Sequence, residues 1–152
     1  SRMPTNKGSS ARTRQDARDL LIKALYQWQL GGHDLPELLA QFALTPEFAR
    51  IDKRYFEALL AAVIGNADNL DSLISAQADR DIKTVDAVSR ALLLLGLEEL
   101  NSRPDVPTKV VINEAVELAK RYGPPDCFRF VNAVLDKAAK EMAGRRESVS
   151  GG

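Results

Sequence analysis

The chain has 152 residues, with 21 lysine and arginine residues against 21 aspartate and glutamate residues, and 45% of its residues are apolar. This composition is typical of a soluble globular domain and excludes a disordered chain, which would be poorer in aliphatic residues and further from neutrality. The longest apolar run, from Ala91 to Leu97, is far shorter than the roughly 18 residues that a membrane span requires.

Apolar residues recur at helical spacing along the chain, and this pattern predicts an all-α protein. The first predicted helix carries the stripe Ala17, Leu21, Ala24, Leu25 and Trp28 and ends before Gly31-Gly32. The segment Asp34-Leu-Pro-Glu37 predicts the capped start of a short helix that runs to about Phe42. Thr45-Pro46-Glu47 is another sequence typical of a helix start.

The next helices follow from their apolar faces. One carries Phe56, Leu59, Leu60 and Val63, and another follows Asn66 and carries Leu70, Leu73 and Ile74. A polar break over residues 81–86 precedes a helix with Val88, Ala91, Leu92 and Leu95, which is apolar on most sides and therefore expected at the centre of a bundle. Two more helices are predicted over about residues 108–122 and 126–142, separated by Gly123-Pro-Pro125.

We therefore expect about seven helices in a compact bundle of small helical subdomains, with the break near residue 80 as a candidate boundary. The predicted organisation is a flexible basic arm over residues 1–13, a helical domain over residues 14–142 and a disordered tail over residues 143–152.

The zero net charge conceals a basic N-terminus. Residues 1–23 contain six basic residues against two acidic ones, a net charge of +4, so the remainder carries −4. This asymmetry indicates either a local contact with a polyanion or a solvated helix start. Arg14 and Arg18 share a helical face with Leu21 and Leu25, and because a buried unpaired arginine is costly, we expect both guanidinium groups at an end of the domain, open to phosphates.

A second candidate cluster lies on the last two predicted helices. Arg129 shares a polar face with Asn132 and Asp136, Phe130 lies on its flank, and Tyr122 directly precedes the Gly-Pro-Pro turn. Such aromatic residues beside a cation suit the stacking of unpaired bases. The alternative is that Phe130 and Tyr122 are rim residues of the core.

The sequence offers no catalytic motif, and we expect no enzyme, metal or cofactor. The single cysteine, Cys127, excludes an intrachain disulfide, and the single histidine, His33, leaves no ordinary zinc site. No hydrophobic signal segment follows the N-terminus, so the expected location is cytoplasmic.

Three segments resemble the NusB family of bacterial transcription antitermination factors over roughly residues 11–142. They are Ala24-Leu-Tyr-Gln-Trp-Gln-Leu30, Tyr55-Phe56, and the long block that starts at Asp105-Val-Pro-Thr-Lys-Val-Val-Ile-Asn-Glu and continues into Phe130-Val-Asn-Ala-Val-Leu-Asp136. The resemblance implies an all-helical fold of two small subdomains that binds boxA-type single-stranded RNA together with NusE, a small-subunit ribosomal protein. It also implies that this pair joins the elongating RNA polymerase with other Nus factors, notably on ribosomal RNA operons.

Matching the family's RNA surface to the two clusters predicts eight RNA-binding residues: Arg12, Arg14, Arg18, Lys120, Tyr122, Asp126, Arg129 and Phe130. No membrane and no small-molecule substrate are expected, and the choice between monomer and homodimer stays open. The alternative function is a helical protein–protein adaptor without sequence-specific RNA binding.

The chain departs from the family pattern at several positions. Gln15 and Asp16 interrupt the arginine arm, and Ala133, Cys127 and Phe128 stand where glycine, serine and a polar residue are common. Leu94 and Glu98 replace an arginine and a tyrosine in the helix that helps to meet NusE in the family. These replacements leave the NusE-contacting residues of this chain unassigned.

Overall fold

The computed structural model describes the backbone of residues 6–151 and the side chains of residues 10–145. Seven α-helices and two short 3-10 helices make up the regular structure of this part of the chain, which contains no strand, and the predicted all-α fold is confirmed. The chain forms two compact units; the first ends at Gly65 and the second begins at Asn66. The boundary therefore does not lie at the polar break near residue 80, because that break connects two helices of the second unit.

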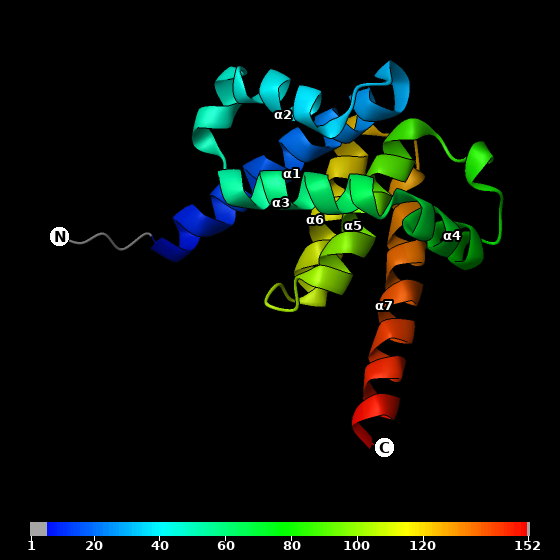
Figure 1. Cartoon of the computed structure of the whole chain (residues 1–152). Coiled ribbons are helices and arrows are strands. Elements are labelled where there is room, and N and C mark those ends of the chain that lie inside the picture. The colour runs from blue at the N-terminus through cyan, green and yellow to red at the C-terminus, as the bar shows by residue number, and fades with distance from the viewer. Residues whose placement is uncertain (1–5, 152) are drawn as a thin grey trace. The chain divides into compact units, whose positions relative to one another are not determined.

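The first unit contains α1 (Asn6–Gly31), α2 (Leu35–Ala43), the 3-10 helix η1 (Pro46–Arg50) and α3 (Lys53–Gly65). Helix α1 packs against α2, η1 and α3, as the ribbon in Figure 1 allows the reader to follow. The core of the first unit is apolar, and Phe56 lies at the centre of an aromatic cluster. The ring centroids of Phe42 and Phe48 lie 6.3 and 6.0 Å from that of Phe56. In the first unit, α1 is thus the longest helix and packs against three shorter elements.

Local sequence signals account for the ends of these elements. Gly32 adopts a φ of +69° directly after α1, a left-handed conformation that glycine accepts without a Cβ penalty. Asp34 caps α2 as predicted: its side chain accepts a hydrogen bond from the Glu37 backbone N–H, and the Glu37 side chain accepts one from the Asp34 N–H, both at 3.0 Å. The start signal at Thr45-Pro46 leads only to the 3-10 helix η1, because the chain turns again at Ile51 and Asp52 to begin α3.

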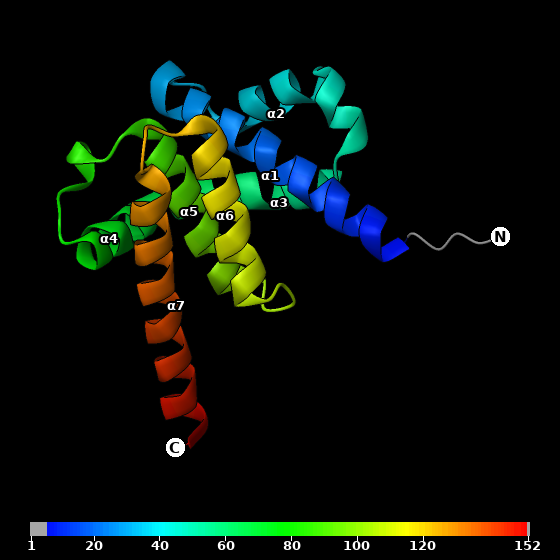
Figure 2. The same ribbon diagram turned by 180° about the vertical axis from the view of Figure 1, so that it is seen from behind.

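The second unit contains α4 (Ala67–Ala78), the 3-10 helix η2 (Ile82–Thr84), α5 (Ala87–Ser102), α6 (Thr108–Tyr122) and α7 (Cys127–Gly151). Helices α4, α6 and α7 all pack against α5, and α6 lies beside α7 in both views (Figures 1 and 2). Every residue from Ala91 to Leu100 is buried, as expected for a central helix. Helix α5 therefore forms the core on which the other helices of this unit assemble.

The two ends of the described chain differ from the predictions. Residues 6–13 belong to α1, although a flexible arm was expected there, and α7 continues to Gly151, past the expected end at residue 142. Both segments are rich in glycine and serine, which are weak helix formers, so the extensions follow from the low cost of adding residues to an existing helix. The parts of the predicted arm and tail at residues 1–5 and 152 lie outside the described residues.

Candidate nucleic-acid interface

In the first unit, two predicted RNA-binding arginines meet one tyrosine. The guanidinium carbons of Arg14 and Arg18 lie 4.5 and 5.5 Å from the centroid of the Tyr55 ring, which is fully buried on α3. The four-residue spacing on α1 brings both arginines to the side that faces α3. Cation–π attraction between these two arginines and Tyr55 therefore holds the basic end of α1 against α3.

Arg18 is not presented at an end of the domain, contrary to the prediction. Only 4% of the residue is exposed, and its guanidinium donates a hydrogen bond to the Tyr55 hydroxyl at 3.3 Å. The prediction treated burial as too costly, but an aromatic ring and a hydroxyl acceptor offset the lost hydration. Arg18 holds α1 against α3, and its guanidinium is not open to a phosphate.

Arg14 and Arg12 are the more accessible arginines of this unit. The Arg14 side chain is about one-third exposed, and its Nε lies 3.7 Å from the Asp52 carboxylate. Asp52 also caps α3, since its side chain accepts a hydrogen bond from the Tyr55 backbone N–H at 3.1 Å. Arg12 is exposed on α1. Arg12 and the outer side of Arg14 are thus the cationic groups of this cluster that a phosphate can reach.

The other five predicted residues lie close together at the turn between α6 and α7. Lys120 and Tyr122 belong to the last turn of α6, where a positive charge also suits the negative end of the helix dipole. Tyr122 is 37% exposed. Asp126 precedes α7, and Arg129 and Phe130 lie in its first turn. This turn is the second candidate surface.

The turn is closely packed. Asp126 has a φ of +67°, and its carboxylate lies 3.6 Å from Arg129 Nε. A Cβ at Gly123 would overlap the Cys127 sulfur and would come within 2.8 Å of the Ala119 carbonyl oxygen. The end of α6 and the start of α7 are therefore held at a distance that glycine alone permits.

We expect the substitution Gly123→Ala to lower the free energy of unfolding by about 1–3 kcal/mol, because the clash involves backbone that cannot move freely. Urea denaturation measures this change. Gly65→Ala is the matched control: a Cβ there meets nothing within 4 Å, so its stability should be unchanged or slightly higher. Equal stabilities of the two variants would contradict the close packing.

An aromatic residue absent from the predicted site lies in the first turn of α7. Phe128, which is half-buried, has Lys120 Nζ 5.2 Å and the guanidinium carbon of Arg129 5.0 Å from its ring centroid. The sequence carried a signal for it, since Phe128 stands where the NusB family commonly has a polar residue. Phe128 gathers two of the predicted basic residues around one ring.

Phe130 is half-buried and also has a cation against its ring. The guanidinium carbon of Arg80, an exposed residue after α4, lies 4.5 Å from the Phe130 ring centroid. Sequence reasoning missed Arg80 because its contact with α7 spans 50 positions and no local pattern records it. The turn thus combines aromatic rings with lysine and arginine side chains, the groups that bind unpaired bases and phosphates.

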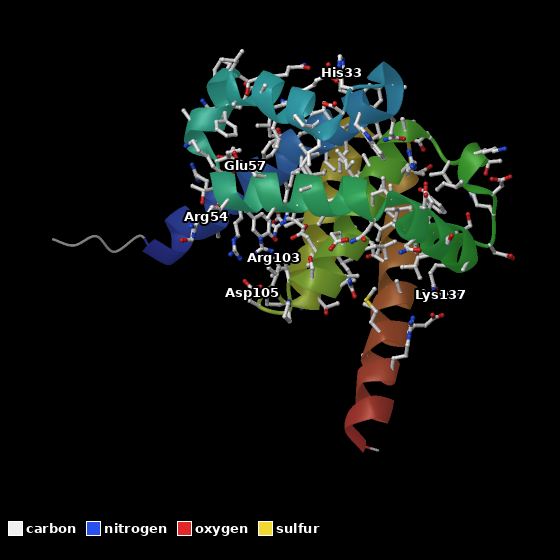
Figure 3. All side chains as sticks on the ribbon, viewed as in Figure 1. His33, Arg54, Glu57, Arg103, Asp105 and Lys137 are labelled. Carbon is white, nitrogen blue, oxygen red and sulfur yellow. The ribbon has the colours of Figure 1, made fainter. Side chains whose placement is uncertain are left out.

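Other site chemistries find little support in the described part of the chain. It contains no group of three or more histidine, cysteine or acidic side chains placed to hold a metal ion. His33 lies in the turn between α1 and α2 (Figure 3). Cys127 is buried, which raises the pKa of its thiol, and its sulfur lies 3.7 Å from the Ala119 carbonyl oxygen. Among the described helices, none is long and apolar enough to cross a membrane.

Comparison with known proteins gives a consistent result. The sequence model of the NusB family matches residues 15–140. A transcription antitermination protein NusB from Alcanivorax borkumensis is 43% identical over 137 residues, which cover 90% of this chain and 91% of that protein. The solved structure of T. maritima NusB superposes with a TM-score of 0.74 at 32% identity, covering 85% of this chain and 92% of that one.

A further solved structure contains the antitermination factors NusB and NusE in complex with double-stranded RNA. A chain of that structure matches with a TM-score of 0.68 at 27% identity, covering 86% of this chain and 98% of its own length. The family match and the extent of the curated similarity both span nearly the whole sequence. The chain therefore belongs to the NusB family.

Proposed function

We propose that this protein is a transcription antitermination factor that binds boxA-type single-stranded RNA together with NusE and joins the elongating RNA polymerase complex. Family membership supports the antitermination role, and the solved complex of NusB and NusE with double-stranded RNA supports NusE and RNA as partners. The observation on this chain that carries the proposal is the α6–α7 turn, where Lys120, Arg129 and three aromatic residues lie within residues 120–130. Other Nus factors would act through this assembly.

The two proposed surfaces, one in each unit, would bind RNA by two kinds of contact. Arg12, Arg14, Lys120 and Arg129 would supply salt-dependent contacts to phosphates. Tyr122 and Phe130 would offer their rings to bases, and Asp126 would accept hydrogen bonds from base amino groups. Arg18 would contribute indirectly, by fixing the position of α1 through Tyr55.

In this proposal the protein is a scaffold that makes and breaks no covalent bond, and it acts in the cytoplasm, where nascent RNA is transcribed. Few basic side chains are available, so binding of RNA by this protein alone should be weak. NusE would extend the surface, and thermodynamic linkage requires RNA to strengthen the binding of NusE by the same factor.

Fluorescence anisotropy tests the proposal with a short boxA-like RNA and a scrambled RNA, each with and without NusE. We expect NusE to tighten the binding of the boxA-like RNA and not of the scrambled one. Equal affinity for both RNAs in the presence of folded NusE would instead support the adaptor function without sequence-specific RNA binding.

The substitution Arg129→Ala should weaken binding of the boxA-like RNA several-fold. It should also reduce the slope of log affinity against log salt by about 0.7, because the variant neutralises one phosphate fewer than the wild type. Lys137→Ala is the matched control, because it removes one exposed cation from the same helix about two turns further along. The assignment fails if both variants change the salt slope equally.

A further inference from the structure

Phe128 holds two cations at the α6–α7 turn. Lys120 Nζ and the Arg129 guanidinium carbon both lie within about 5 Å of its ring centroid. These two cations come from different helices, the last turn of α6 and the first turn of α7. A single ring therefore joins the two basic groups that flank the turn.

The two cations stay accessible in this arrangement. The Lys120 and Arg129 side chains are 51% and 75% exposed, although each also has a carboxylate nearby on its own helix or turn, Glu117 at 3.5 Å and Asp126 at 3.6 Å. Ion pairs this exposed are weak and readily exchanged for a competing anion. The ring and the carboxylate both lie near Lys120 Nζ, but a cation on a ring face keeps N–H groups that are directed away from the ring, so an anion that replaces the carboxylate does not displace the ring.

The backbone that carries the Phe128 ring is held in place by close packing. Phe128 follows Cys127, whose sulfur packs against Gly123, and Gly123 has no space for even a Cβ atom. The backbone of the turn therefore holds the Cα and Cβ atoms of Phe128 relative to α6 and limits the positions of its ring. Long, flexible lysine and arginine side chains that rest on a ring held in this way lose less conformational freedom on binding than the same side chains free in solvent.

We propose that Phe128 is a positioning residue of the RNA-binding surface, which holds Lys120 and Arg129 together so that both engage the same stretch of single-stranded RNA. The inference rests on the proposed function and adds to it a residue outside the eight predicted ones. Arg129 held in this way presents its guanidinium to a phosphate or a base, and Lys120 supplies a second positive charge beside it.

A double-mutant cycle tests this role with boxA-like RNA and NusE. The four proteins are the wild type, Phe128→Leu, the double variant Lys120→Ala/Arg129→Ala, and the triple variant. Leucine keeps an apolar side chain of similar size but has no π face. We expect Phe128→Leu to weaken binding about five- to tenfold in the wild-type background, to lower the salt slope, and to have no effect once both cations are gone.

Two further variants separate positioning from folding. Phe128→Tyr should restore affinity to within about twofold of the wild type, because it restores the ring. Phe48→Leu removes another half-buried ring that has a lysine, Lys53, 5.4 Å from its centroid, and it should leave RNA affinity unchanged. Thermal melting of each variant confirms that affinities are compared between folded proteins.

The outcomes are distinguishable from a failure of the proposed function. If wild-type protein with NusE does not prefer the boxA-like RNA, the proposed function and this inference fall together. If the wild type shows that preference and Phe128→Leu binds equally well, only the inference is overturned. A reduction in affinity of the same size in both backgrounds also overturns it, because Phe128 would then act independently of the two cations.

Discussion

Replacing Arg18 with alanine is expected to lower the free energy of unfolding by about 2–4 kcal/mol. The side chain is 4% exposed, lies 5.5 Å from the Tyr55 ring centroid and donates a hydrogen bond to the Tyr55 hydroxyl. Its removal leaves a cavity between α1 and α3 and takes a donor away from a buried hydroxyl, and each effect costs stability. Urea denaturation followed by circular dichroism measures the change.

Arg12→Ala is the matched control for this prediction, because it removes an exposed arginine less than two turns away on the same helix. Its unfolding free energy should stay within about 0.5 kcal/mol of the wild type. An Arg18→Ala variant as stable as Arg12→Ala would contradict the structural role. The prediction also changes how RNA binding by an Arg14→Ala/Arg18→Ala double variant is interpreted, since a reduced affinity there would include partial unfolding.

Asp71→Ala is expected to destabilise the second unit by about 2–3 kcal/mol. The Asp71 carboxylate accepts two hydrogen bonds from Arg90, at 2.9 Å from Nε and at 2.6 Å from Nη2, and so joins α4 to α5. The two side chains are only 20% and 21% exposed, so the substitution leaves a partly desolvated guanidinium without its bidentate partner. Thermal melting and urea denaturation measure the destabilisation.

Asp136→Ala provides the comparison for an exposed pair. Asp136 lies 3.0 Å from Lys140 within α7, but their side chains are 51% and 78% exposed. Ion pairs in water contribute little, so this variant should differ from the wild type by less than about 1 kcal/mol. If both aspartate variants are destabilised equally, burial and bidentate geometry are not what makes the Arg90 pair strong.

The helices could be predicted from the sequence where the signal is local. The capping box at Asp34 and Glu37, and the stop at Gly32, depend on residues within one turn of each other, and the structure has both. The bounds of α6 agree with the predicted range for the same reason. Weaker local signals misled: Gly144 does not end α7 near residue 142, and the glycine and serine residues at positions 8–10 do not delay the start of α1 to residue 14.

The site was harder to predict because its contacts join distant segments. Helical spacing placed Arg18 on the apolar face correctly. The sequence does not indicate, however, that the hydroxyl of Tyr55, 37 positions away, accepts a hydrogen bond from the Arg18 guanidinium. The same limit hid the contact between Arg80 and Phe130. Phe128 was visible as a departure from the family pattern, yet its role depends on two helices meeting at one turn. The role of the eight predicted residues in binding RNA stays a prediction.

The buried thiol of Cys127 is a built-in probe of local opening at the α6–α7 turn. It is the single cysteine of the sequence, and burial shields its thiol and raises the thiol pKa, so a smaller fraction is deprotonated at neutral pH than for an exposed cysteine. A thiolate-specific reagent has to wait until Gly123 and Ala119 move away from the sulfur. The rate of alkylation therefore reports how often the segment beside Phe128 opens, and a ligand that rests on this segment would slow the reaction.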